Sequence, residues 1–301
     1  MKTDKSPVAV KKTTDRKAGV QGVLKTLGLN PVKGKKVLLK PNFNTADPTP
    51  GSTHNDTLTA LVEELWAMGA ASISLGERSY PPTREVMEQK GIPALMDRLE
   101  VAIVNFDELP EKDWVEIFPK DSHWPKGFRI ARPVLEAECL VSTCCLKTHQ
   151  FGGIFTMSLK LAVGTVPTGR HGFDYMRVLH TSPHQRKMIA EINQPFKPAL
   201  IILDGIEAFV DGGPATGKTA RGEVFLASSD RVALDAVGVA VLKKLGSNPA
   251  IMNTPIFEQE QIRRAAELGL GAQGPDDIEL LAEDPDSWEY ARRVAAILAQ
   301  G

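Results

Sequence analysis

Short, nearly continuous apolar runs alternate with helical patterns along this chain, and this alternation constrains the fold more than any other feature. Such runs are typical of strands that are covered on both faces of a parallel sheet. Six strands are predicted, at residues 36–40, 72–77, 101–106, 139–144, 199–204 and 223–228. The pattern therefore predicts a three-layer, Rossmann-like α/β fold, in which helices cover both faces of a mainly parallel, twisted sheet.

The helices are predicted from apolar residues spaced three and four positions apart. Between the first two strands, Leu58, Leu61 and Leu65 follow this spacing, and Gly69 is placed to end the helix. A second strong pattern begins after Ser229 or Asp230 and stops at Gly246. Further helices are predicted near residues 15–28, 83–98, 185–194, 257–268 and 286–299.

Residues 1–301 are predicted to form a single α/β domain, a length that suffices for one large buried core. Two polar stretches rich in proline and glycine interrupt it, at residues 107–135 and 165–184. We interpret both as loop insertions over one edge of the sheet.

Charge and hydropathy exclude several classes of partner. The formal net charge is −1, so the chain has no global basic field that would favour nucleic acid. No apolar run approaches the roughly 18–20 residues that a membrane span needs, and the charged N-terminus lacks the apolar stretch of a secretory leader. We therefore expect a cytoplasmic protein with neither nucleic acid nor membrane as its partner.

The three cysteines give no sign of a disulfide framework. Cys139, Cys144 and Cys145 lie within seven residues, and no two of them have the C-x-x-C spacing. A low, odd number of cysteines suits a reducing compartment. Cys139 and Cys144 lie in an apolar run and are interpreted as small core residues.

Charged and amide side chains follow the ends of the predicted strands. They include Lys40, Asn42, Glu77, Lys147, His149 and Asp204. Each has a structural explanation, because loops are polar and acidic residues often cap helices. In open parallel sheets, however, ligands bind outside the carboxyl ends of the strands. The concurrence of these side chains at one edge therefore predicts a binding site there.

The stretch "CLKTHQFGGIFTMSLKLAVG" is the densest in such residues. Gly152 and Gly153 are expected to open a short helix, whose free backbone N–H groups would favour an anion. Thr156 and Lys160 are four positions apart, so they are expected on one face of that helix. The stretch predicts a pocket for an anion or carboxylate. The alternative is that Lys160 reaches into solvent and His149 is a structural histidine.

Three histidines lie close together in the second insertion. Pro183 separates His180 from His184, so the rigid two-histidine geometry of a zinc-binding helix is not expected. A flexible lid that contributes one histidine, His180, is the favoured interpretation. Whether His171 and His184 join it over the site stays open.

Four carboxylates require a role. Asp204, Asp211 and Glu77 are candidates to bind a divalent metal, and the two aspartates are alternatively candidates to orient His149. Asp235 lies on the apolar face of its predicted helix, where a buried carboxylate needs a partner. Structural and site roles for Asp235 both remain open.

Residues 211–224, "DGGPATGKTARGEV", have the G-x-x-x-x-G-K-T spacing of a phosphate-binding loop. Such a loop joins a buried strand directly to a helix that faces the phosphates. Here seven residues separate the loop from the strand at 199–204, and a strand rather than a helix follows. A strand–loop–strand arrangement is therefore predicted, and P-loop nucleotide binding is the weakest of the functions considered.

Four segments resemble, in order and spacing, the signature blocks of the family catalogued as domain of unknown function 362. They are "VLLKPNFN", "CCLKTHQFGGIFTMSLKLAVGTVP", "IILDGIEAFVDGGPATG" and "LASSDRVALDAVG". The matching positions are Lys40, Pro41, Asn42, Lys147, His149, Lys160, Asp204, Gly205, Gly213, Pro214, Gly217, Asp230 and Asp235.

The resemblance implies no settled activity. It accounts for the glycines of residues 212–217 without requiring Lys218 or Thr219. Many members of the family carry a ferredoxin-like iron–sulfur module, whose cysteine pattern is missing here, so no iron–sulfur cluster is expected from this chain. In layout only, the chain is also similar to nickel-dependent lactate racemases, which place lysine and histidines around a cofactor.

These residues together predict an enzyme or binding protein for a small anionic metabolite. His149 is the expected general acid or base, with Lys147 and Lys160 as the other catalytic candidates. The candidate binding residues are Lys40, Asn42, Thr156, Gly152, Gly153, Gly213 and His180. No cofactor is identified beyond the candidate divalent metal. The alternative is a non-catalytic component of a redox or cofactor-assembly system, which binds a redox partner or a second copy of the chain.

Overall fold

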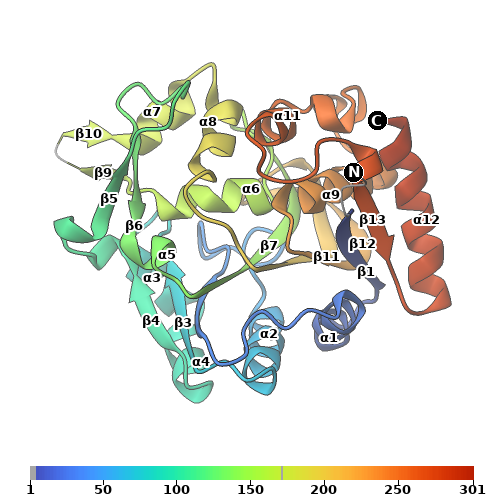
Figure 1. Ribbon diagram of the computed structural model, residues 1–301, viewed down its shortest axis with the longest axis horizontal. Helices are drawn as coiled ribbons and strands as arrows, with labels where there is room; N and C mark the ends of the chain where they lie inside the picture. The colour runs from blue at the N-terminus through green and yellow to red at the C-terminus, as the bar shows by residue number, and fades with distance from the viewer. Residues whose placement is uncertain (1–4, 171) are drawn as a thin grey trace.

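One sheet takes its strands from both ends of the chain (Figure 1). The computed structural model describes residues 5–170 and 172–301, and within them this sheet has nine strands in the order β13-β1-β12-β11-β7-β2-β3-β4, with β8 paired to β7. The strands are β1 (Ser6–Lys12), β2 (Lys36–Lys40), β3 (Ser72–Glu77), β4 (Ala102–Asn105), β7 (Cys139–His149), β8 (Ile154–Phe155), β11 (Leu200–Gly212), β12 (Gly217–Ser228) and β13 (Ile278–Leu281). Neighbours run parallel except where β12 pairs β1 and β11, and β8 pairs β7. The predicted mainly parallel α/β fold is confirmed.

Helices cover the two faces of the sheet as separate layers (Figure 1). One layer contains α1 (Arg16–Leu27), α2 (Asn55–Ala67), α3 (Thr83–Gln89) and α4 (Ile92–Arg98). The other contains α6 (Ser158–Leu161), α8 (Gln185–Ile192), α9 (Arg231–Leu245), α10 (Pro249–Met252), α11 (Glu260–Glu267) and α12 (Pro285–Gln300). Side chains of β2 alternate between the layers: Val37 and Leu39 pack with α1–α4, and Leu38 packs on the opposite face.

The two predicted insertions form small sheets of their own. Residues 107–135 contain the hairpin of β5 (Trp114–Ile117) and β6 (Phe128–Ala131), followed by α5 (Arg132–Leu135). Residues 165–184 contain β9 (Gly169–Arg170), β10 (Phe173–Asp174) and α7 (Tyr175–Thr181). Apolar side chains of both segments share one core with Leu38 and Leu140 of β2 and β7. The segments therefore cover a face of the sheet over its central strands.

The remaining helical segments are single 3-10 turns. They are Phe106–Glu108, Glu111–Asp113, Ala162–Thr165, Ile256–Glu258 and Pro275–Asp277. Among the described residues, no helix combines the length and the apolar character needed to cross a bilayer.

Some element boundaries differ from the predictions. The single helix predicted at 83–98 is two helices, because Gly91 between them adopts a left-handed φ of +66°. The strands predicted to end at residues 144 and 204 continue to His149 and Gly212. β1 and β13 were not predicted, since each offers only a few consecutive apolar residues.

The G-x-x-x-x-G-K-T segment is the turn of a hairpin, as its flanking sequence predicted. In the ladder of β11 and β12, Asp211 pairs with Lys218 and Gly212 with Gly217. Gly213 has a φ of +70°, and a Cβ there would lie 2.1 Å from the carbonyl oxygen of Thr148. The glycines thus allow the turn to pack against the end of β7, and the element that follows the loop is the strand β12 rather than a helix.

Asp235 has a structural role, and the sequence alone had left both a structural role and a site role open. Its carboxylate on α9 is fully buried and accepts hydrogen bonds from the backbone N–H groups of Ser158 (2.8 Å) and Leu159 (3.0 Å). These are the first residues of α6, so Asp235 fixes the start of the helix that carries Lys160. Burial raises the pKa of Asp235 to about 7, although both hydrogen bonds oppose this shift.

Replacing Asp235 by alanine is expected to lower the free energy of unfolding by about 2–5 kcal/mol, because two buried N–H groups lose their acceptors. Urea denaturation monitored by circular dichroism measures the loss. Asp235→Asn is the matched control, since it keeps one acceptor oxygen and should lose less. A loss within about 0.5 kcal/mol for Asp235→Ala would show that the helix start does not depend on this carboxylate.

Candidate functional site

A cavity of about 960 Å³ opens at the carboxyl ends of β2, β3 and β7. β2 and β7 are neighbours in the sheet, but the chain leaves β2 towards α2 in one layer and leaves β7 towards α6 in the other. This reversal is a topological switch point, where open parallel sheets bind their ligands. The predicted edge of the sheet therefore contains a cavity in which a ligand of metabolite size has room.

Positive charge predominates in the lining of the cavity. Five cationic side chains and two carboxylates contribute to it. The cations are Lys40, Arg78, Lys147, Lys160 and Arg177, and the carboxylates are Glu77 and Asp174. Charges of one sign on low-dielectric walls attract ligands of the opposite sign, so the cavity favours an anion.

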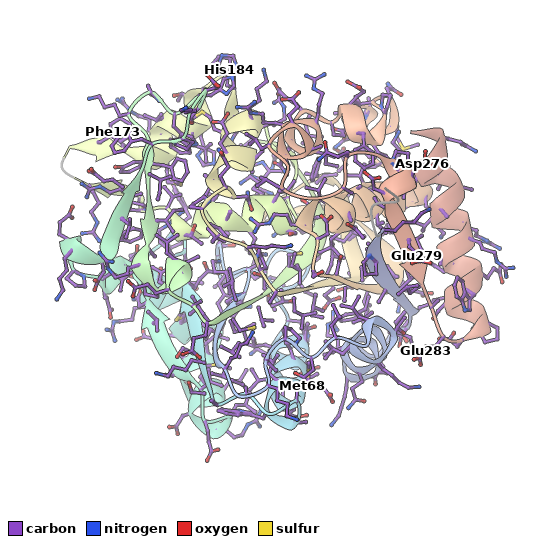
Figure 2. All side chains as sticks on the ribbon, in the orientation of Figure 1. Met68, Phe173, His184, Asp276, Glu279 and Glu283 are labelled. Atoms are coloured by element: carbon purple, nitrogen blue, oxygen red, sulfur yellow. The ribbon has the colours of Figure 1, made fainter. Side chains whose placement is uncertain are left out.

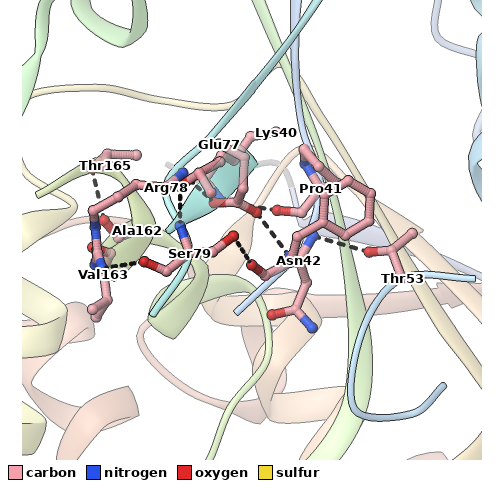
Figure 3. Close-up of polar contacts among 12 residues, drawn as sticks. Lys40, Pro41, Asn42, Thr53, Glu77, Arg78, Ser79, Ala162, Val163 and Thr165 are labelled. Atoms are coloured by element: carbon pink, nitrogen blue, oxygen red, sulfur yellow. Dashed lines mark hydrogen bonds and ion pairs between the residues drawn. The ribbon is translucent and has the colours of Figure 1, made fainter. Parts of the chain in front are cut away.

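The buried ion pair of Lys40 and Glu77 joins the ends of β2 and β3 (Figure 3). Lys40 Nζ donates to Glu77 Oε1 at 2.5 Å and to the carbonyl oxygen of Pro41 at 2.8 Å. Glu77 also accepts from the backbone N–H groups of Phe43 (2.8 Å) and Arg78 (2.9 Å). Burial lowers the pKa of Lys40, and Glu77 opposes the shift. The charge of Lys40 is therefore compensated within the protein.

Lys147 is buried without an acidic partner. Its side chain is 1% exposed, and Nζ donates to the carbonyl oxygens of Gly51 (2.5 Å) and Pro214 (3.4 Å). Burial lowers the pKa of the amine. Carbonyl oxygens carry only partial charges, so Lys147 holds two loops at the rim of the cavity while most of its own charge stays uncompensated.

Arg78 directly follows the end of β3 and lines the cavity, although it was not among the predicted catalytic or binding residues. Its buried guanidinium donates to the carbonyl oxygens of Val163 (2.8 Å) and Ser79 (3.2 Å). Its Nε is buried and has no hydrogen-bond partner among the described residues. Burial lowers the pKa of Arg78. Neutral groups thus accept its hydrogen bonds, while the carboxylates of Glu77 and Asp107 act on the guanidinium without a hydrogen bond to it.

Lys160 and His149 meet beside Gly153. A Cβ at Gly153 would lie 2.9 Å from His149 Nδ1 and 3.2 Å from Lys160 Cε, so a larger residue there would force these side chains to shift. Lys160 has no hydrogen bond or ion pair to any residue that the structure describes. Burial, together with the charges of Lys147 and Arg78, lowers the pKa of Lys160 to about 7.

The surroundings of His149 favour its neutral form. It is 5% exposed, and its Nδ1 is buried without a partner in the described part of the chain. Burial and the charge of Lys160 lower its pKa to about 2. A neutral imidazole with an unpaired nitrogen in a cavity is able to accept a proton or a hydrogen bond from a ligand.

The predicted anion site at a helix N-terminus is wrong. α6 begins at Ser158, not at Gly152 and Gly153, and the buried carboxylate of Asp235 occupies its first two N–H groups. The two glycines lie in the turn between β7 and β8 instead. Thr156 precedes the helix, yet it lines the cavity together with Lys160.

The structure does not bring the three candidate metal-binding carboxylates together. Asp204 points towards the opposite layer, where it accepts from Arg16 Nε (3.0 Å) and Thr57 Oγ1 (2.6 Å). Asp211 is exposed in the β11–β12 hairpin, and Glu77 is paired with Lys40. Residues 5–170 and 172–301 contain no cluster of three or more His, Cys, Asp or Glu that suits a metal ion. Neither aspartate contacts His149.

The second insertion contributes one side of the cavity. His180 lines it and donates from Nδ1 to the carbonyl oxygen of Met176 at 2.8 Å, which leaves Nε2 free in the neutral ring. Arg177 lines the same side. His184 lies at the periphery of the molecule (Figure 2). Its ring packs at a tilt of 51° against that of His123, with 4.6 Å between ring centroids. His171 lies outside the described residues.

Two predicted binding residues remain to be placed, Asn42 and Gly213. Asn42 lines the cavity and donates from Nδ2 to the carbonyl oxygen of Gly51 at 3.2 Å. Gly213 is not part of the lining, but the residues that follow it in the hairpin turn, Pro214 and Ala215, are.

Glu77→Gln is expected to lower the free energy of unfolding by about 3–5 kcal/mol, because it leaves the ammonium of Lys40 buried without its carboxylate. Urea denaturation measures the change. The double variant Lys40→Met with Glu77→Gln has no buried charge at this position and should recover most of the loss. The importance of this ion pair would be refuted by a single variant as stable as the wild type, or by a double variant no more stable than the single one.

One curated protein and one solved structure illustrate what this chain is similar to. The thylakoid-associated protein sll1697 of Synechocystis sp. is 27% identical over 262 residues, which cover 85% of this chain and 76% of the relative. The lactate racemase apoprotein of Thermoanaerobacterium thermosaccharolyticum superimposes with a TM-score of 0.48 at 16% identity. That superposition covers 75% of this chain and 54% of the racemase, so the chain spans about half of the racemase's length.

The family follows from the sequence blocks that surround the cavity. Residues 37–240 match the family described as domain of unknown function (DUF362). This region is well over half of the chain, and it contains β2, β3, β7, the second insertion and the β11–β12 hairpin. The chain belongs to the DUF362 family, as its signature blocks predicted.

Proposed function

We propose that this protein is an enzyme that binds a small anionic metabolite in the cavity and exchanges a proton with it through His149. The observation that carries the proposal is the charge of the lining. Lys147, Arg78 and Lys160 are directed into one cavity, and none of them contacts a carboxylate of the described residues. Buried charges in native proteins are normally paired, so an anionic ligand would supply the missing partner.

The ligand would also activate His149. In the free protein, burial and the charge of Lys160 hold the pKa of His149 near 2, so the imidazole is a very weak base. An anion beside Lys160 would offset that charge and raise the pKa of His149. The histidine would then gain basicity only when a ligand is bound, which suits a general base.

Two aromatic side chains extend the proposed site beyond the cationic side chains that line the cavity. Tyr80 is 74% exposed and Phe151 is 62% exposed, and both contribute to the lining. Exposed aromatic side chains at the rim of a cavity are suited to cover an apolar or planar part of a ligand. We therefore propose a metabolite with an anionic end near Lys160 and a less polar part near Phe151.

Calorimetric titration with a panel of small carboxylates and phosphate esters tests the proposal. At least one compound is expected to bind, and Arg78→Met and Lys160→Met are each expected to weaken binding by about 10- to 100-fold, the effect of losing a charge-assisted hydrogen bond. His149→Gln should retain binding but lose turnover of the compound by about 10²- to 10⁴-fold.

Lys218→Met is the matched control for this panel. Lys218 is an exposed lysine on β12 outside the lining of the cavity, so its loss should leave the affinity unchanged. Native mass spectrometry of the purified protein, which detects a co-purifying metabolite, would guide the choice of compounds. The proposal fails if no anion binds, or if Lys218→Met weakens binding as much as the two cavity variants do.

A further inference from the structure

The three lysines that line the cavity differ in what their amines contact. Lys40 donates to the carboxylate of Glu77, and Lys147 donates to two backbone carbonyl groups. The amine of Lys160 has no partner among the residues that the structure describes. An amine that serves only to bind charge or to hold a loop is normally engaged in the free protein, so Lys160 is available for another role.

On the basis of the proposed function, we propose that the metabolite is a 2-oxo acid and that the amine of Lys160 forms an imine with its carbonyl carbon. A 2-oxo acid places a carboxylate directly beside an electrophilic carbonyl group. Arg78 and Lys147 supply cations for the carboxylate, and Lys160 lines the same cavity and approaches His149 at Gly153. The carbonyl carbon would then face the free amine.

The surroundings of Lys160 favour nucleophilic chemistry. Only the neutral form of an amine attacks a carbonyl carbon, and lysine is activated by burial or by neighbouring cations. Lys160 has both, and together they lower its pKa from the ordinary 10.5 to about 7, which favours the neutral, nucleophilic form. The anion of the ligand would raise the pKa of Lys160 again and so restore some of its positive charge. The rise would be limited, because the same anion would also interact with Arg78 and Lys147.

The reaction needs no oxidant or reductant. The nitrogen lone pair of Lys160 forms a bond to the carbonyl carbon, and the carbonyl π electrons move to the oxygen. One amine proton moves to that oxygen and gives a carbinolamine. The second amine proton leaves with the hydroxyl group as one molecule of water, and the C=N bond forms. His149 is neutral and lies next to Lys160 at Gly153, so it is positioned to carry these protons between nitrogen and oxygen.

Reductive trapping tests the imine. The protein is incubated with pyruvate, 2-oxobutyrate or 2-oxoglutarate, treated with sodium borohydride, and analysed by intact-mass and peptide mass spectrometry. At least one of these acids is expected to leave a single reduced adduct, located on Lys160. Lys160→Arg keeps the positive charge but cannot form the imine, so the adduct should disappear. Lys218→Arg, outside the cavity, should form the adduct like the wild type.

Calorimetry with the same acids, their 2-hydroxy analogues and inorganic phosphate separates this proposal from the proposed function. Binding of a 2-oxo acid without an adduct on Lys160 would overturn the imine and leave the anion site standing. Binding of phosphate or a hydroxy acid, but of none of the oxo acids, would overturn the assignment of the substrate class. If none of these anions bound, the imine would be overturned, and the proposed function would fail as well if the wider panel of carboxylates and phosphate esters also gave no binding. An adduct spread over several lysines would also overturn the imine.

Discussion

The site depends on one constraint: the fold has to accommodate several positive charges in the protein interior where β2, β3 and β7 end. Each cation at this edge meets that constraint differently. Lys40 is paired with a carboxylate, Lys147 and Arg78 are held by neutral carbonyl groups, and Lys160 has no partner among the described residues. A fold selected only for stability would pair or remove such charges, because unpaired buried charge is destabilising. Their presence in one cavity is the observation on which the proposed anion site rests.

The fold supports this arrangement through its central strand. β7 is buried along its whole length and is flanked by parallel strands on both sides, so Lys147 and His149 leave the sheet at fixed positions. Asp235 on the neighbouring helix α9 fixes the start of α6, and α6 carries Lys160. Gly153 allows His149 and Lys160 to approach each other. The catalytic candidates therefore depend on backbone elements that are rigid and packed.

Much of this arrangement was predictable from local pattern. Continuous apolar runs identify buried parallel strands, and polar residues after such runs identify the edge where a ligand binds. The length of β7 was not predictable in this way, because its last residues are polar and buried against the cavity rather than against an apolar layer. Arg78 was passed over for a related reason: a single arginine after a strand is unremarkable until its acceptors are known to be neutral.

Other errors came from three-dimensional contacts that a single sequence does not contain. Asp204 belongs to the opposite layer because of the alternation of side chains along β11, which depends on where the strand begins and on its register. The free helix N-terminus predicted at Gly152 does not exist, because a carboxylate 77 residues away in the chain satisfies the true start of α6. The hairpin turn was predicted correctly, because there the deciding information was the sequence directly on either side.

The pKa of the Lys160 amine is the most direct test of the proposed anion site. Neighbouring cations without a bound anion lower this pKa, and an anion that binds beside the amine raises it again. With ¹³C-labelled lysine, the Cε resonance that is missing in Lys160→Arg gives this pKa by NMR titration. We expect a midpoint near 7 in the free protein, against an ordinary value of 10.5, and a clear rise when inorganic sulfate is present at saturating concentration. A midpoint near 10.5 without sulfate, or one near 7 that sulfate leaves unchanged, would contradict it.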